Sequence, residues 1–210
     1  MKNKITPILI ILLFLFITTA FAFFEAKPQV RVENKYRYDT RQDNHALYIT
    51  RVSAAFNYLD ALDEPIFKFI PFFESRLNLG KDFWERKEIG IEIGKDIFPF
   101  LYLGESLQQV WMKEDYRYYS QYESRDQFEA ETRLMLKHDL ISNDSIKLKC
   151  FVANEYTYDF NNGKGVRNEI VGGFVMPFGK HIETDLVWRH IDRIHHYDSD
   201  VVETSITLIF

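Results

Sequence analysis

The chain has 210 residues, a formal net charge of −5, 46% hydrophobic residues and 16% aromatic residues. This hydrophobic content exceeds that of disordered chains, and the single cysteine, Cys150, excludes a disulfide framework. A sequence pI near 5.7 and the lack of a basic block argue against a nucleic-acid-binding protein. The chain nevertheless combines 19 Phe and 12 Tyr with a mean hydropathy of −0.26, so its many aromatic residues coexist with a polar average.

The first 22 residues have the layout of a secretory signal peptide. Two lysines lie within the first four residues, and an unbroken apolar run extends from Ile8 to Ile17. Ala20-Phe21-Ala22 then matches the small-residue cleavage pattern. An apolar run this short does not readily span a bilayer as a helix, although an uncleaved anchor is the alternative. We therefore expect residues 1–22 to be removed and residues 23–210 to form one exported domain.

The rest of the chain alternates between apolar and polar residues, which is typical of β-strands. We expect ten strands, with eight or twelve as alternatives. Their ranges are 29–38, 46–59, 66–78, 84–94, 97–112, 126–138, 145–159, 167–176, 181–191 and 201–210. Two of them are irregular: residues 66–78 contain Pro71, and a regular strand over 97–112 would place Glu105 on the apolar face. We therefore expect a bulge or a change of register in these segments.

The connections between these strands are expected to alternate in length. Short turns are predicted at 60–65, 95–96, 139–144 and 177–180, and longer polar stretches at 39–45, 79–83, 113–125, 160–166 and 192–200. Hairpins with one short-looped end and one long-looped end are typical of outer-membrane barrels. The predicted fold class is therefore all-β, an up-and-down antiparallel transmembrane β-barrel with both termini at the short-turn, periplasmic side.

The polar face of the predicted strands carries acids and bases in nearly equal numbers. Charges enclosed in a narrow lumen need partners, because the desolvation of an unpaired charge is costly. We therefore expect a closed lumen whose charges form a paired network. The residues assigned to it are Arg31, Glu33, Arg37, Glu74, Arg76, Glu129, Glu131, Arg133, Lys147, Lys149, Glu183, Asp185 and Arg189.

Aromatic residues gather at the two ends of the predicted strands. Tyr36, Tyr48 and Trp188 are examples on the long-loop side, and Phe178 and Phe210 on the short-turn side. Two aromatic girdles around an apolar band are typical of the two membrane interfaces. The alternative is a soluble, lipocalin-like barrel with the apolar face inside. The girdles and the balanced charges favour a barrel with its apolar face toward lipid.

The end of the chain resembles the C-terminal signature of bacterial outer-membrane β-barrel proteins. Its alternating row is Val202, Thr204, Ile206, Leu208 and Phe210, which ends in an aromatic residue. The resemblance covers the last strand closely and the rest of the chain only as a general pattern. It implies a Gram-negative-type outer membrane, insertion by the barrel-assembly machinery with the help of periplasmic chaperones, and contact with outer-membrane lipid and lipopolysaccharide. It does not imply an activity.

Candidate chemistry is concentrated in the last long connection. His190, His195, His196 and Asp198 lie close together in the sequence, and such residues can bind a metal or transfer protons. Some small outer-membrane barrels are hydrolases or acyltransferases that act on lipid A, but their catalytic spacing is not found here. A polar surface loop has the same composition without any activity. We therefore expect no metal and no cofactor, and the sequence does not identify an enzyme.

The longest predicted connection, residues 113–125, contains Tyr116, Tyr118, Tyr119 and Tyr122 among charged residues. Tyrosines of this kind suit a protein or glycan ligand, although a strand pair with an aromatic rim has the same composition. The resulting functional expectation is a structural or interaction role through long extracellular loops. A lipid-modifying hydrolase with a site at the rim, or a narrow channel, remains the alternative.

Overall fold

The computed structural model describes residues 28–41, 46–59, 65–80, 83–112, 126–143, 147–193 and 198–210. Within these ranges it contains ten β-strands. They are β1 (Gln29–Asp39), β2 (Ala46–Leu59), β3 (Pro65–Asn78), β4 (Phe83–Phe98), β5 (Leu101–Met112), β6 (Asp126–Ser142), β7 (Lys147–Asp159), β8 (Lys164–Phe178), β9 (Ile182–Arg193) and β10 (Ser199–Ile209). In these ranges no helix has the length and apolar character needed to cross a membrane.

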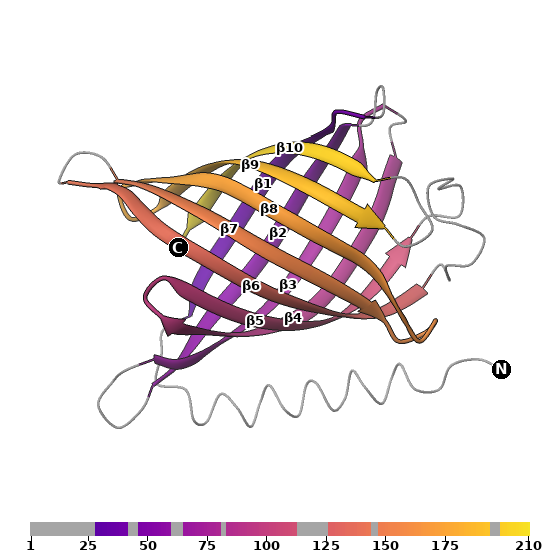
Figure 1. Cartoon of the computed structure of the whole chain (residues 1–210), viewed down its shortest axis with the longest axis horizontal. Helices are drawn as coiled ribbons and strands as arrows, with labels where there is room; N and C mark the ends of the chain where they lie inside the picture. Colours follow the sequence, from indigo (N-terminus) through magenta and orange to yellow (C-terminus); the bar gives the residue numbers. More distant parts are fainter. Residues whose placement is uncertain are drawn as a thin grey trace.

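The ten strands form one closed antiparallel barrel (Figure 1). Each strand pairs with its neighbours in sequence, and β1 pairs with β10 to close the sheet. At this seam, Val30 and Phe210 exchange two backbone hydrogen bonds, with N···O distances of 3.2 and 2.9 Å. The first and last strands therefore begin and end at the same end of the barrel. We call this the terminus-side end and the opposite one the loop-side end.

The alternating pattern of the sequence places one set of side chains inside the barrel and the other set on its outer surface. On β10, Val202, Ile206 and Leu208 point outward and are exposed, whereas Glu203 and Ser205 point inward and are buried. The same parity holds on β9, where the outward Leu186 is 55% exposed and the inward Val187 is 8% exposed. Closure of the sheet leaves no unpaired strand edge, as a membrane requires. The apolar side chains on the outside of the barrel are suited to contact with lipid. The predicted transmembrane barrel is confirmed.

The expected connections differ from the structure in length and place. The turn predicted at residues 95–96 is wrong, because β4 continues to Phe98 and Asp96 pairs with Tyr102 of β5. Three of the expected long polar stretches are also shorter than predicted. The described strand β4 begins at Phe83, and β8 and β10 begin at Lys164 and Ser199, where polar residues continue the backbone ladder beyond the apolar band. Gly163, with a φ of 62°, turns the chain between β7 and β8.

Glu105 is a second correction. The sequence predicts a bulge or register change that keeps this carboxylate off the apolar face. In the structure Glu105 is exposed on the outer face of β5, between Leu103 and Leu107, in unbroken register with Ile93 and Thr132. The irregularity between β4 and β5 lies instead between Asp96 and Phe98. Thr132 Oγ1 donates a hydrogen bond of 2.7 Å to Glu105, so a neighbouring strand supplies a partner and the strand remains regular.

Candidate functional site: the lumen and the loop-side rim

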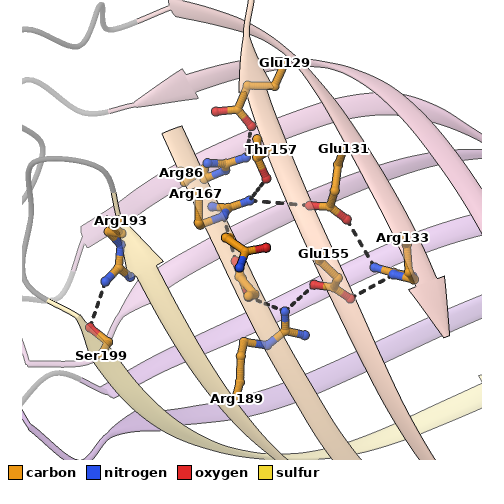
Figure 2. Close-up of polar contacts among 12 residues, drawn as sticks. Arg86, Glu129, Glu131, Arg133, Glu155, Thr157, Arg167, Arg189, Arg193 and Ser199 are labelled. Atoms are coloured by element: carbon orange, nitrogen blue, oxygen red, sulfur yellow. Dashed lines mark hydrogen bonds and ion pairs between the residues drawn. The ribbon is translucent and has the colours of Figure 1, made fainter. Parts of the chain in front are cut away.

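Arg189 is the centre of the ion-pair network inside the barrel. Its Nη1 lies 2.5 Å from Glu155 Oε2 (Figure 2). The same Nη1 donates to Glu169, and its Nε lies 2.7 Å from Glu203 Oε1. Glu203 also accepts a hydrogen bond of 3.1 Å from Arg37 across the β1–β10 seam. The three carboxylates come from β7, β8 and β10, so one guanidinium joins three strands besides its own.

Arg86 forms a second centre on the opposite wall. This side chain is 1% exposed and contacts Glu88 at 2.6 Å and Glu129 at 2.9 Å. Gln108 Nε2 donates a further hydrogen bond of 2.8 Å to the same Glu129 oxygen. A charge this deeply buried is stable only when its hydrogen-bonding capacity is met by charged or polar partners. The packing of Arg86 therefore joins β4, β5 and β6 inside the lumen.

Two further arginines extend the network from the Arg189 centre, and Figure 2 shows them on either side of Glu131. Arg133 contacts Glu131 at 3.3 Å and Glu155 at 2.8 Å. Arg167 contacts Glu131 at 3.5 Å and donates a hydrogen bond of 3.2 Å to Thr157 Oγ1. Arg133 also lies 3.9 Å from Glu92 on β4, which extends the network to the β2–β4 wall. On that wall Arg76 lies 3.6 Å from Glu88, the partner of Arg86.

The network continues on the β2–β4 wall. Arg51 lies 3.8 Å from Glu74 and 3.5 Å from Glu92, and Arg76 lies 2.7 Å from Glu74. The Arg51 guanidinium also stacks over the Phe72 ring, 3.9 Å from the ring centroid. An arginine that is both paired and stacked is held in one orientation, because its planar group fits a carboxylate edge and an aromatic face.

Aliphatic side chains pack among the ion pairs of the loop-side half of the lumen. Inward residues near the loop-side ends of four strands are almost fully buried: Ile49, Val110, Ile191 and Val201, at 1%, 0%, 1% and 2% exposure. Met112 on β5 is buried as well. Val110 is paired in register with Glu88, and Val201 with Arg189, so buried aliphatic side chains lie beside the ion pairs and leave water little access to this half of the lumen. The loop-side half is therefore sealed.

The terminus-side half of the lumen is different. Arg31 pairs with Glu183 at 2.6 Å, with side chains 36% and 29% exposed. Nearer the turns, Lys68 and Lys137 both contact Asp96, and all three side chains are about one-third exposed. Since these residues point into the barrel and are still reached by solvent, the lumen is open to water at its terminus-side end.

One wall of the open half contains a close-packed tyrosine. Tyr102 Oη donates a hydrogen bond of 2.5 Å to Glu92, and the ring lies against the backbone of two glycines. A Cβ added at Gly94 would lie 1.8 Å from Tyr102 Oη, and one at Gly104 would lie 2.9 Å from the ring. Glycine is required at both positions because any side chain would occupy the volume of the tyrosine.

The residues predicted for the lumen network are placed as follows. Inward and within the barrel are Arg31, Glu33, Arg37, Glu74, Arg76, Glu129, Glu131, Arg133, Glu183, Asp185 and Arg189. Lys147 and Lys149 are instead exposed at the start of β7. Sequence reasoning missed Arg167, although it has the same parity as Glu169 and could have been found from the alternation. It also missed Glu85, an extra residue at the β3–β4 register shift that parity cannot assign.

The rim candidates are only partly within the described residues. His195 and His196 lie outside them, and Asp198 is exposed just before β10. His190 points outward from β9, and its Nδ1 lies 2.8 Å from Asp200 Oδ1 on β10. No described residues form a group of three or more His, Cys, Asp or Glu side chains suited to a metal ion.

The residues of the expected assembly signal form one outward row. Val202, Thr204, Ile206, Leu208 and Phe210 are all exposed on the lipid-facing side of the last strand. Phe210 is the most exposed of them, at 70%, and lies at the terminus-side end. The row is therefore accessible on the outer surface, and its recognition by an assembly machinery stays a prediction.

Comparison with known proteins finds no matching family model and no matching curated protein. Among solved structures, a bacterial polysaccharide outer membrane secretin has a TM-score of 0.47 and 15% identity, covering 88% of this chain and 70% of that one. The KdgM porin has a TM-score of 0.47 and 9% identity, covering 86% and 99%. An outer membrane channel from Pseudomonas putida F1 has a TM-score of 0.45 and 8% identity, covering 90% and 98%. The similarity is confined to the barrel fold.

Proposed function

We propose that this protein is an outer-membrane barrel that does not conduct solutes and that acts through its loop-side surface. The observation that carries the proposal is the sealed loop-side half of the lumen. Arg86, Glu129 and Glu203 are each no more than 2% exposed there, and buried aliphatic side chains pack beside them. A solute would have to separate several buried ion pairs to pass, and each separation would leave an uncompensated charge.

The outer membrane is the location that fits this barrel. The N-terminal pattern of residues 1–22 supports export, and the apolar exterior supports insertion into a bilayer. Closed barrels of this kind belong to outer membranes, with short turns on the periplasmic side. The expected partners are therefore outer-membrane lipid and lipopolysaccharide, the assembly machinery and its periplasmic chaperones. A protein or glycan ligand would bind at the loop-side end, where the sequence of residues 113–125 is rich in tyrosine.

Planar-bilayer recording tests whether the lumen conducts. The wild-type protein, folded in detergent and inserted into a lipid bilayer, is expected to give no current steps. The double variant R189A/R86A is expected to give measurable steps, because it removes the two guanidinium centres that cross-link the walls. R31A is the matched control, since Arg31 lies in the part of the lumen already open to solvent, and it should stay silent. Regular current steps from the wild type would overturn the proposal and favour the narrow channel.

Location is tested separately by fractionation and gel mobility. The protein is expected in the outer-membrane fraction, and its unheated sample should migrate differently from the boiled one, because a closed barrel resists unfolding by detergent. Recovery in the periplasmic fraction without detergent would contradict the membrane assignment.

A further inference from the structure

Three polar side chains converge on the outer surface at the loop-side end of the β9–β10–β1 seam. His190 is contributed by β9, Asp200 by β10 and Arg41 by the chain just after β1. His190 Nδ1 lies 2.8 Å from Asp200 Oδ1, and Arg41 donates through its guanidinium to Asp200 Oδ2. Thr40 Oγ1 adds a hydrogen bond of 2.8 Å to the backbone oxygen of Asp200. The carboxylate is thus held from both sides, between an imidazole and a guanidinium.

The contact with Asp200 gives the two ring nitrogens of His190 different roles. When Nδ1 carries the proton and donates it to Asp200, the lone pair is on Nε2, which is free to accept a proton from outside. Trp188 stacks on the ring, with centroids 6.3 Å apart and planes 20° apart, and limits its rotation. An imidazole that is oriented by a carboxylate and partly exposed to solvent has the arrangement of a general base.

The position of the cluster relative to the membrane determines which ligands can reach it. Trp188 and Tyr38 are outward aromatic residues near the loop-side ends of β9 and β1, at the level expected for a membrane interface. His190 lies one outward position beyond Trp188, so it is next to the polar part of the lipid rather than the hydrocarbon. The side chains of His190, Asp200 and Arg41 are 29%, 23% and 47% exposed. A lipid in the outer leaflet could therefore reach all three.

The charges around the cluster argue against a free anion as its ligand. Asp192 and Asp198 lie exposed on the same rim, and together with Asp200 they outnumber the nearby Arg41. This excess of carboxylates disfavours a site for a free anion such as phosphate.

We propose that His190 is the general base of an esterase site for acyl esters of outer-leaflet lipids. Asp200 positions the imidazole, and the guanidinium of Arg41 stabilises the negative charge that develops on the carbonyl oxygen when water attacks. The proposal assumes the outer-membrane location given above, but it does not depend on whether the lumen conducts.

The reaction is a hydrolysis that needs only water. The water oxygen forms a bond to the acyl carbonyl carbon while its proton passes to His190 Nε2. The bond from that carbon to the ester oxygen then breaks, and the imidazolium returns the proton to the departing alkoxide. The products are a fatty acid and the alcohol of the lipid, and His190 is regenerated.

Fatty-acid release measured by mass spectrometry tests the site. The folded full-length protein is incubated in mixed micelles with dioleoyl phosphatidylethanolamine in one arm and with lipid A in the other. The wild type is expected to release fatty acid in at least one arm, and H190A should lower the rate by about 100-fold or more, because a general base contributes this much. H138A is the matched control, since His138 is exposed near the other end of the barrel, and should leave the rate unchanged.

The role of Asp200 in positioning His190 is tested by a measurement that a purely structural role would leave unchanged. D200N keeps the size of the side chain, so its barrel should retain the mobility shift on boiling while the pH profile of fatty-acid release changes. No release from folded wild type in either arm would overturn the proposal, as would an unchanged rate in H190A. Either result would leave the conductance test of the lumen unaffected.

Discussion

The two halves of the lumen are built from the same residue types but differ in how much water reaches them. In the loop-side half, Arg86 and Glu129 are 1% and 2% exposed and share their partners in a network. In the terminus-side half, Arg31 and Glu183 form a single pair with 36% and 29% exposure. An ion pair in water contributes little to stability, whereas a buried charge that loses its partner is strongly destabilising. The same arginine–glutamate contact therefore has different consequences in the two halves.

The substitution R189A, in the loop-side half, should cause the largest loss in the free energy of unfolding. It leaves Glu155, Glu169 and Glu203 without the cation that they share. We expect a loss of about 3 to 5 kcal/mol in the free energy of unfolding, as for other buried pairs with one partner removed. Urea unfolding in detergent micelles, followed by tryptophan fluorescence, measures this loss. A loss below about 1 kcal/mol would mean that water reaches the loop-side half as well.

The substitution G94A should have an intermediate effect, from packing rather than charge. Its new Cβ would lie 1.8 Å from Tyr102 Oη, so the tyrosine must move and release its hydrogen bond to Glu92. We expect a loss of about 1 to 3 kcal/mol in the free energy of unfolding, the usual cost of overpacking. G172A is the matched control, because its Cβ would meet nothing closer than 3.8 Å. Equal losses in the two variants would contradict the close packing of Tyr102.

The substitution R31A should have the smallest effect. Arg31 pairs with Glu183 where solvent already reaches both side chains, so the remaining carboxylate can be hydrated. We expect a change of no more than about 1 kcal/mol in the same unfolding experiment. Comparison of R31A with R189A directly tests whether solvent reaches the terminus-side half but not the loop-side half. A larger loss of stability in R31A than in R189A would contradict that difference.

Most of the barrel could be predicted because alternation is a local property of each strand. All ten expected strands are present among the described residues, and the parity of Phe128, Leu186 and Ile206 placed their side chains on the correct face. Strand ends were less predictable, because polar residues such as Lys95 and Asp96 suit a turn as well as a strand. Glu105 was misjudged for a related reason: its partner Thr132 is on another strand, 27 residues away.

The candidate sites depend more strongly on contacts that the sequence does not show. Alternation could place Arg189 and Glu203 on the inner face, but not join them to Glu155 and Glu169. His190 was identified from its place in a polar stretch, whereas its partner became clear only when β9 and β10 were paired in register. Arg41 comes from the other end of the chain and reaches Asp200 only because β1 closes the barrel against β10.

The sequence by itself determined the strand order and the division between a lipid-facing and a lumen-facing surface. Both depend on side-chain parity and on neighbouring strands forming hairpins, which are local effects. Only the tertiary structure decided where the lumen is sealed, which charges share partners, and where His190, Asp200 and Arg41 meet. These features arise from closure of the sheet, which sets the relative height of distant strands and therefore which side chains face each other.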